Sequence, residues 1–82
     1  MTKQSITSIL KDISDDYRDN GDVAMCTMKC NSVKVFTISI KNCGNIYCNG
    51  IKIYNTDSLN CYDDGKIIAI LDYSAIEKIS IL

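Results

Sequence analysis

Five cysteines carry the most obvious chemistry in this chain, and their spacing limits what they can bind. They are Cys26, Cys30, Cys43, Cys48 and Cys61. The first two fall in a predicted strand, where four residues span roughly 13 Å, whereas zinc–sulfur bonds of about 2.3 Å require ligands to converge on one ion. The chain has no histidine and no Cys-x-x-Cys sequence. The number of cysteines is odd, and no secretion signal precedes them. We therefore expect no metal, no cofactor and no disulfide framework, with all five thiols reduced and buried as small apolar side chains.

The acidic stretch 15–22 invites comparison with a calcium loop. An EF-hand needs a glutamate at its twelfth position, but counting from Asp15 or Asp16 reaches Cys26 or Thr27. We interpret the stretch as an acidic helix end followed by a loop. Catalysis also lacks support, because no histidine, GxSxG sequence or phosphate-binding glycine loop is present. We predict that the protein is not an enzyme and has no small-molecule substrate.

Tyrosines and lysines in the second half of the chain offer a surface for RNA or for a protein. Aromatic rings stack on nucleobases, and lysines attract phosphates. The residues predicted to form this surface are Tyr47, Lys52, Tyr54, Asn60, Lys66, Asp72 and Tyr73. Tyr62 is a further tyrosine of the same region. We prefer the alternative that tyrosines at strand edges close a small core with their hydroxyls in water.

Length and charge exclude several classes of protein. The 82 residues predict a single domain, residues 1–82, with a modest core. A net charge of −1 argues against a general DNA-coating protein. No stretch approaches the ~18 apolar residues of a membrane span, and the N-terminus lacks a signal-peptide pattern. We expect a cytoplasmic protein that does not contact membranes.

Hydrophobic periodicity predicts one helix followed only by strands. Residues 2–19 show a helical stripe, with Thr2 or Ser5 as the N-cap and Asn20-Gly21 as the stop. The stripe consists of Ile6, Ile9, Leu10, Ile13 and Tyr17. Residues 1–21 are thus assigned to the helix and its cap, and residues 22–82 to antiparallel strands.

Turn residues divide residues 22–82 into strands. The predicted strands are 22–30, 33–41, 46–55, 58–63 and 66–82, the last being a buried strand pair with a corner at residues 72–74. Asn31-Ser32 is compatible with a tight hairpin, and Asp64-Gly65 predicts a type I′ turn. The predicted fold is α+β: an N-terminal helix packed on a small, strongly bent, five- or six-stranded antiparallel sheet or barrel, Sm-like or SH3-like.

Part of this pattern resembles the Sm/LSm superfamily, which includes the RNA chaperone Hfq. Gly50, Thr56 and Asn60 occupy the glycine, aspartate and asparagine positions of the first Sm motif, and residues 71–79 cover the second. Its intervening apolar positions hold Ile51, Ile53 and Leu59. The resemblance implies a helix on a strongly bent five-stranded barrel, and rings in which the last two strands pair between subunits.

The charged residues of the Sm motifs are replaced. Thr56 stands for the aspartate, with Asp57 displaced by one, and Asp72-Tyr73 stand for the Arg-Gly that clamps RNA bases. In a ring, loops 55–60 and 72–75 would line the pore. The repeated Asp72 carboxylates would then oppose the passage of RNA phosphates.

Self-association is also expected from the apolar segment 79–82, which contains no charged residue or proline that would prevent another strand from pairing with its edge. We expect a homo-oligomer built through residues 66–82. Its predicted edge consists of Ile76, Ile79, Ile81 and Leu82. The preferred function is a small protein-interaction or regulatory module, of the kind carried by mobile elements, that binds another protein through an oligomer or a strand edge. The alternative is an Sm-like ring that binds single-stranded RNA.

Overall fold

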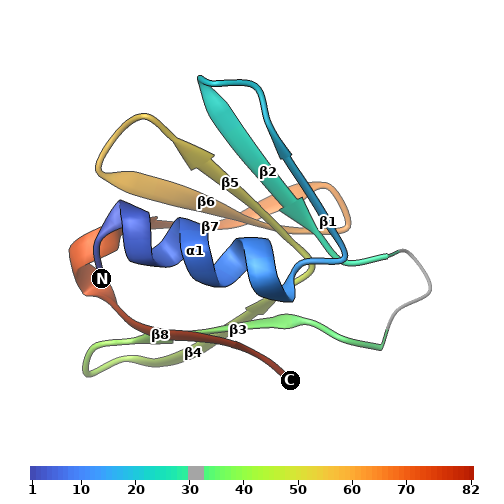
Figure 1. Cartoon of the computed structure of the whole chain (residues 1–82). Coiled ribbons are helices and arrows are strands. Elements are labelled where there is room, and N and C mark those ends of the chain that lie inside the picture. The colour runs from blue at the N-terminus through green and yellow to red at the C-terminus, as the bar shows by residue number, and fades with distance from the viewer. Residues whose placement is uncertain (30–32) are drawn as a thin grey trace.

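One helix and eight antiparallel strands in two sheets make up the computed structural model, which describes residues 1–29 and 33–82 (Figure 1). The elements are α1 (Lys3–Ile13), β1 (Asp16–Asp19), β2 (Val23–Thr27), β3 (Phe36–Ile40), β4 (Gly44–Cys48), β5 (Gly50–Tyr54), β6 (Ser58–Asp63), β7 (Lys66–Asp72), the 3-10 turn η1 (Tyr73–Ala75) and β8 (Ile76–Ile81). The larger sheet has the order β1-β2-β5-β6-β7, and the smaller has the order β4-β3-β8.

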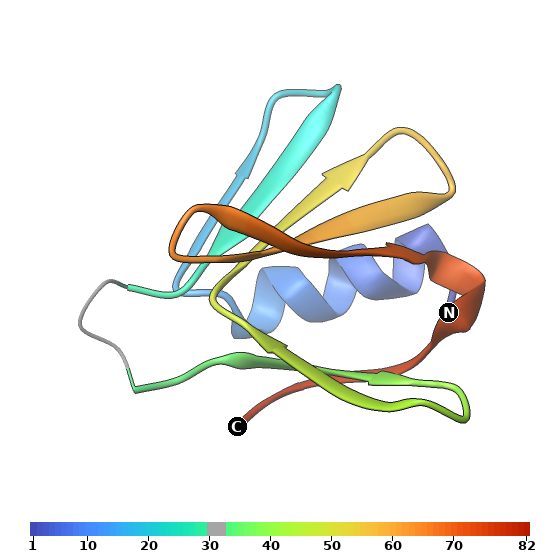
Figure 2. The same cartoon turned by 180° about the vertical axis from the view of Figure 1, so that it is seen from behind.

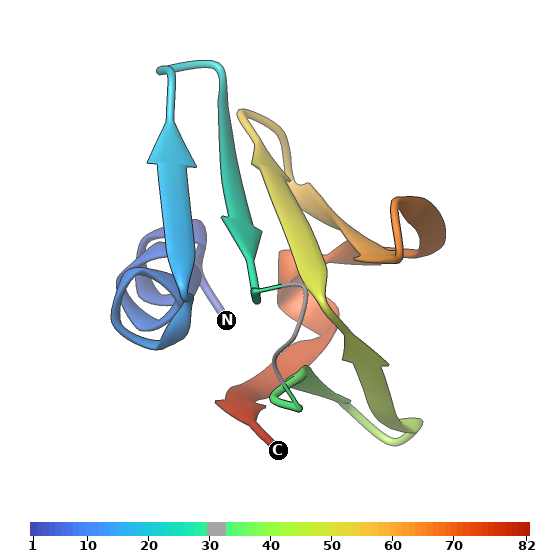
Figure 3. The ribbon, with the colours of Figure 1, turned by 90° about the vertical axis from the view of Figure 1, so that its right-hand side faces the viewer.

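The two sheets meet at two corners. At one, β4 leads into β5 through Asn49 alone, and at the other β7 leads into β8 through η1. The sheets splay apart from these corners, and α1 lies along the open side between them (Figures 2 and 3). The predicted α+β class with an N-terminal helix is therefore confirmed. Closure into a barrel is wrong, as is the count of five or six strands, because the chain changes sheet at Asn49 and adds β1 in the acidic stretch.

Helix α1 begins as predicted and ends early. The Thr2 hydroxyl caps it by accepting from the Ser5 amide at 3.1 Å. The helix stops at Ile13 rather than residue 19, because Ser14 is extended and the acidic residues after it disfavour a helix C-terminus. Those residues form β1, where the Tyr17 side chain packs against the core from a strand instead of from the helix.

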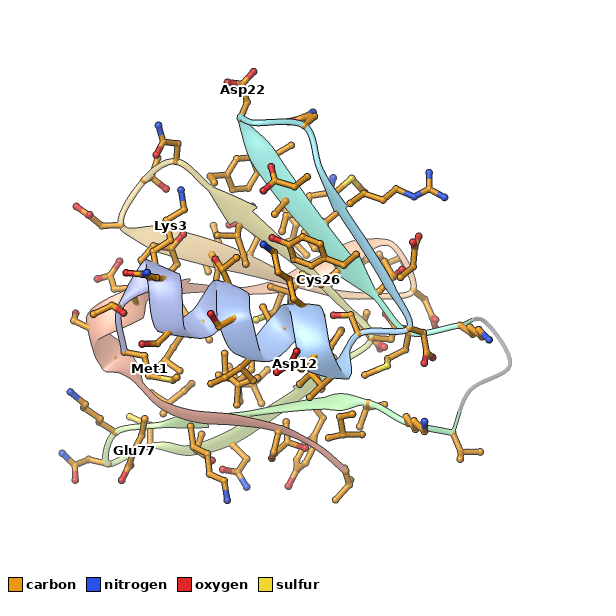
Figure 4. All side chains as sticks on the ribbon, viewed as in Figure 1. Met1, Lys3, Asp12, Asp22, Cys26 and Glu77 are labelled. Atoms are coloured by element: carbon orange, nitrogen blue, oxygen red, sulfur yellow. The ribbon has the colours of Figure 1, made fainter. Side chains whose placement is uncertain are left out.

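Asn20 and Gly21 make the β1–β2 turn, so their assignment as a helix stop is wrong. Gly21 has a φ of 95°, and the Asn20 side-chain oxygen accepts from the amides of Asp22 and Val23. Asp22 lies at the tip of this hairpin (Figure 4). The acidic stretch 15–22 thus contains a strand and a tight turn.

Strand β2 lies within the predicted strand 22–30, but its partners differ from those expected. It pairs with β1 and β5, whereas β3 pairs with β4 and β8. The two predicted runs 22–30 and 33–41 are therefore not neighbours in a hairpin. The connection proposed at Asn31-Ser32 lies outside the described residues.

The hairpin between β6 and β7 is confirmed. Asp64 and Gly65 have φ angles of 50° and 81°, the two positive values that a type I′ turn requires. The bounds of β6, Ser58–Asp63, match those predicted. The turn thereby fixes where β7 begins and in which direction it runs.

The core lies between the two sheets and α1. Its buried residues are Ile6, Leu10, Ala24, Cys26, Met28, Phe36, Ile38, Cys48, Ile51, Ile53, Leu59, Cys61, Tyr73, Ile76 and Ile79. Three of the five cysteines are buried as predicted; Cys43 is exposed, contrary to expectation, and Cys30 lies outside the described residues. In the described part of the chain, no helix is long and apolar enough to cross a membrane.

Candidate interaction surface

Strand β7 exposes most of its apolar side chains. Ile67 is 54 % exposed, Ile68 47 % and Ile70 64 %. Only Ala69 and Leu71 of this strand turn inward and pack against the core. The prediction that residues 66–82 form a buried strand pair is therefore wrong for β7, which is one of the two edge strands of the larger sheet.

A register shift explains why two consecutive isoleucines are exposed. Tyr62 of β6 stands opposite Ile67, whereas Cys61 stands opposite Ala69, so Ile68 is an extra residue in the ladder. Such an irregularity interrupts the alternation of faces along a strand. Ile67 and Ile68 consequently both stay outside the core.

The outer side of β7 also presents backbone groups. In an antiparallel ladder, every second residue turns its N–H and C=O away from the neighbouring strand. Among the described residues, β6 is the sole strand paired with β7. We call this unpaired side, with its three exposed isoleucines, the β7 edge. Edges of this kind are templates for pairing with another chain.

A second group of side chains lies on the outward face of the same sheet. Lys52 pairs with Asn60 in the β5–β6 ladder, and neither side chain faces the core, which is lined by Ile51 and Leu59. The Lys52 ammonium lies 4.9 Å from the centre of the Tyr62 ring. We call Lys52, Tyr54, Asn60 and Tyr62 the outer-face cluster.

Hydrogen bonds join the hydroxyls of the outer-face cluster. The Asn60 amide donates to the Tyr62 hydroxyl oxygen at 3.5 Å and lowers the pKa of Tyr62, with the Tyr54 hydroxyl and Lys52 acting in the same direction. The hydrogen bond with Tyr62 raises the pKa of Tyr54.

A groove of about 550 Å³ adjoins the outer-face cluster. Gly50 forms part of its wall, between Thr27 and Tyr62, which are its partners on the two neighbouring strands. At one end Asn49 and Asp64 exchange two hydrogen bonds of 3.1 and 3.2 Å. These bonds tie the β4–β5 corner to the β6–β7 turn and thereby fix the end of the groove next to β7.

The structure brings together only part of the predicted surface. Lys52, Tyr54 and Asn60 meet in the outer-face cluster, but Tyr47 belongs to β4 in the other sheet. Tyr73 is buried, and its hydroxyl donates to the Tyr54 carbonyl at 3.0 Å. Lys66 and Asp72 occupy the two ends of β7. Tyr73 is thus separated from the outer-face cluster, and its hydroxyl is hydrogen-bonded within the fold.

The predicted oligomer edge is likewise divided. Ile76 and Ile79 are in the core, whereas Ile81 is 37 % and Leu82 73 % exposed. Exposure of Ile67, Ile68 and Ile70 was not predicted, because an unbroken apolar run is typical of a strand buried on both faces. The sequence does contain one indication of this exposure. The run follows directly after a two-residue hairpin turn, so it pairs with the preceding strand on one side and leaves its other edge unpaired.

Metal ligation and nucleophilic attack require the thiolate, which two of the three buried thiols, Cys26 and Cys48, disfavour, whereas the hydrogen bond with Cys48 lowers the pKa of Cys61. Burial raises the pKa of Cys26 to about 11. A hydrogen bond with Cys61, together with burial, raises the pKa of Cys48. Within the residues that the structure describes, no three cysteine or carboxylate side chains are grouped as a metal site. The absence of a metal remains a prediction for chemical analysis of the purified protein.

Comparisons of the chain with protein-family models, with curated proteins and with solved structures give no match. The interpretation of the surface therefore depends on its own residues.

Proposed function

We propose that this protein is a non-enzymatic interaction module that binds protein partners, including copies of itself, by adding a strand to the β7 edge. The observation that carries the proposal is the combination of an unpaired backbone edge with three exposed isoleucines on the same strand. Strand addition supplies main-chain hydrogen bonds, and flanking apolar side chains add affinity. An uncovered apolar edge of this length is an aggregation hazard, which a bound partner removes.

Substitution of Ile70 by lysine tests this proposal. A lysine at an edge discourages pairing, and Ile70 is 64 % exposed, so Ile70→Lys should abolish association without unfolding the protein. Val33→Lys is the matched control, since Val33 is an exposed apolar residue outside β7. We expect sedimentation velocity to show concentration-dependent association for the wild type and Val33→Lys, and a 9.1 kDa monomer for Ile70→Lys. A monomeric wild type at high concentration would overturn the proposal.

Single-stranded RNA binding is a second candidate function, and the outer-face cluster favours it. Two tyrosines and a lysine on one sheet face are the elements of a stacking surface. The strand order from β3 to β8 also supports an Sm-like arrangement, in which β4 and β5 correspond to one strongly bent strand and the β1–β2 hairpin is an addition. On this interpretation the two sheets correspond to an Sm-like fold that is not closed.

Filter binding with U-rich and A-rich RNA at ~150 mM salt separates the two candidates, because phosphate contacts weaken as salt rises. An RNA-binding cluster predicts submicromolar affinity that falls in Lys52→Ala and is unchanged in Lys78→Ala, whose lysine is exposed on the smaller sheet. No detectable binding would leave protein interaction as the only candidate.

A further inference from the structure

We infer that two copies of this chain bind each other by antiparallel pairing of their β7 strands, across a two-fold axis that passes beside Ala69. The pairing would join two five-stranded sheets into one continuous sheet. This inference rests on the proposed function, because it specifies one partner and one orientation for the β7 edge.

Charge at the two ends of β7 sets the orientation. The strand begins with Lys66 and ends with Asp72, and both residues are exposed. Neither Lys66 nor Asp72 takes part in an ion pair within the described part of the chain, so both charges can interact with another molecule. Antiparallel pairing brings the lysine end of each copy beside the aspartate end of the other. Parallel pairing would place like charges together, which is unfavourable.

The apolar residues between Lys66 and Asp72 can contact the same residues of a second copy. Centring the pair on Ala69 brings the exposed isoleucines on its two sides, Ile68 at the register shift and Ile70, beside those of the other copy, twice by symmetry. Both are exposed in the single chain and would gain a cross-strand apolar neighbour. The residue at the axis is alanine, whose small side chain permits close approach of the two strands.

Strand β8, one of the two edge strands of the smaller sheet, is a poorer partner for β7. Strand β8 exposes Glu77 and Lys78 in its first half, while its apolar Ile76 and Ile79 are directed into the core. Pairing β7 with β8 of another copy would place these two charges beside the exposed isoleucines, where they would lose hydration without a matching partner. The β7 edge therefore complements a second β7 edge better than it complements β8.

Charge reversal tests the orientation. Lys66→Asp makes both ends of β7 acidic, and Asp72→Lys makes both ends basic. Each single variant should dimerise roughly tenfold more weakly than the wild type, since two favourable end contacts become repulsive. An equimolar mixture of the two variants should form a heterodimer of near wild-type affinity, and the double variant K66D/D72K should regain homodimerisation. Sedimentation equilibrium at ~20 mM and ~500 mM salt measures these affinities, and circular dichroism checks that each variant is folded.

The Ile70→Lys variant and the charge variants together distinguish the antiparallel β7 dimer from binding at the β7 edge in general. If Ile70→Lys abolishes association but the mixture of charge variants shows no recovery, β7 pairs with another surface, such as β8 in a ring, and the antiparallel dimer is excluded. If Ile70→Lys leaves association unchanged, the β7 edge is not the interface and both proposals are overturned. If the recovery occurs and disappears at high salt, the two-fold antiparallel pairing is supported.

Discussion

Strands β7 and β8 are alike in sequence and opposite in environment. Each is an isoleucine-rich segment, and the two are separated only by η1. Yet Ile76 is fully buried and Ile79 is 5 % exposed in β8, whereas Ile70 of β7 is 64 % exposed. The difference comes from what lies beside each strand. Helix α1 contacts β8 and covers the face that carries Ile76 and Ile79, whereas the face of β7 that carries Ile70 has no such cover among the described residues.

The comparison shows that apolar composition alone does not identify the core of a chain this small. A continuous apolar strand belongs either to an interior or to an interface, and both bury it. Only one face of β7 packs against the core, and the residues on that face are Ala69 and Leu71. We therefore interpret the remaining isoleucines as a contact surface.

Truncation of one isoleucine in each strand should give the largest contrast. Ile76→Ala should lower the free energy of unfolding by about 2–5 kcal/mol, because it leaves a cavity in a fully buried site. Ile70→Ala should change it by less than about 0.5 kcal/mol at concentrations where the protein is monomeric. Urea unfolding measured at low protein concentration checks both values. Equal losses would show that β7 is as much a part of the core as β8.

The same distinction between interior and surface extends to the thiols and gives a pH prediction. Burial raises the pKa of Cys26 from 9.0 to about 11, so folding favours its neutral form. The resulting stabilisation is complete below pH 9 and is lost as the pH rises towards 11, because the unfolded state ionises first. The expected contribution is a fall of about 1.4 kcal/mol per pH unit within that window.

Chemical denaturation between pH 8 and 11 tests this contribution. The slope due to Cys26 should be absent in Cys26→Ala and retained in Cys43→Ala, whose cysteine is exposed in the β3–β4 turn. An unchanged slope in Cys26→Ala would assign the pH dependence to other groups, such as Tyr73, whose pKa is also raised by burial.

The Tyr73 hydroxyl should add to the stability of the corner between β7 and β8, where the N-terminal ammonium also donates to the carbonyls of Tyr73 and Ile76 at 2.8 Å. Tyr73→Phe removes the donor to the Tyr54 carbonyl and should cost about 1 kcal/mol of unfolding free energy. Tyr47→Phe, at a tyrosine that is 49 % exposed, should cost less than about 0.5 kcal/mol. Thermal unfolding of the two variants in parallel provides the measurement. If both lose the same amount, the hydroxyl does not hold the corner.

Local chemistry made several features of this fold predictable. The helix cap at Thr2, the type I′ turn at Asp64-Gly65, the bounds of β6 and the burial of Cys26, Cys48 and Cys61 were each predicted. They depend on a side chain next to its own backbone, on a required sign of φ, or on the apolar character of one residue. These features depend on a few neighbouring residues and can therefore be recognised in the amino-acid sequence.

Two of the features that were predicted wrongly depend on residues far apart in sequence. The change of sheet at Asn49 was set by the two ladders that flank it, and the exposure of β7 by the position of α1 over the other sheet. The outer-face cluster likewise required the register that aligns Lys52 with Asn60. A hydrophobic pattern specifies that a strand must be covered, but only the packed chain decides whether its own helix or another molecule covers it.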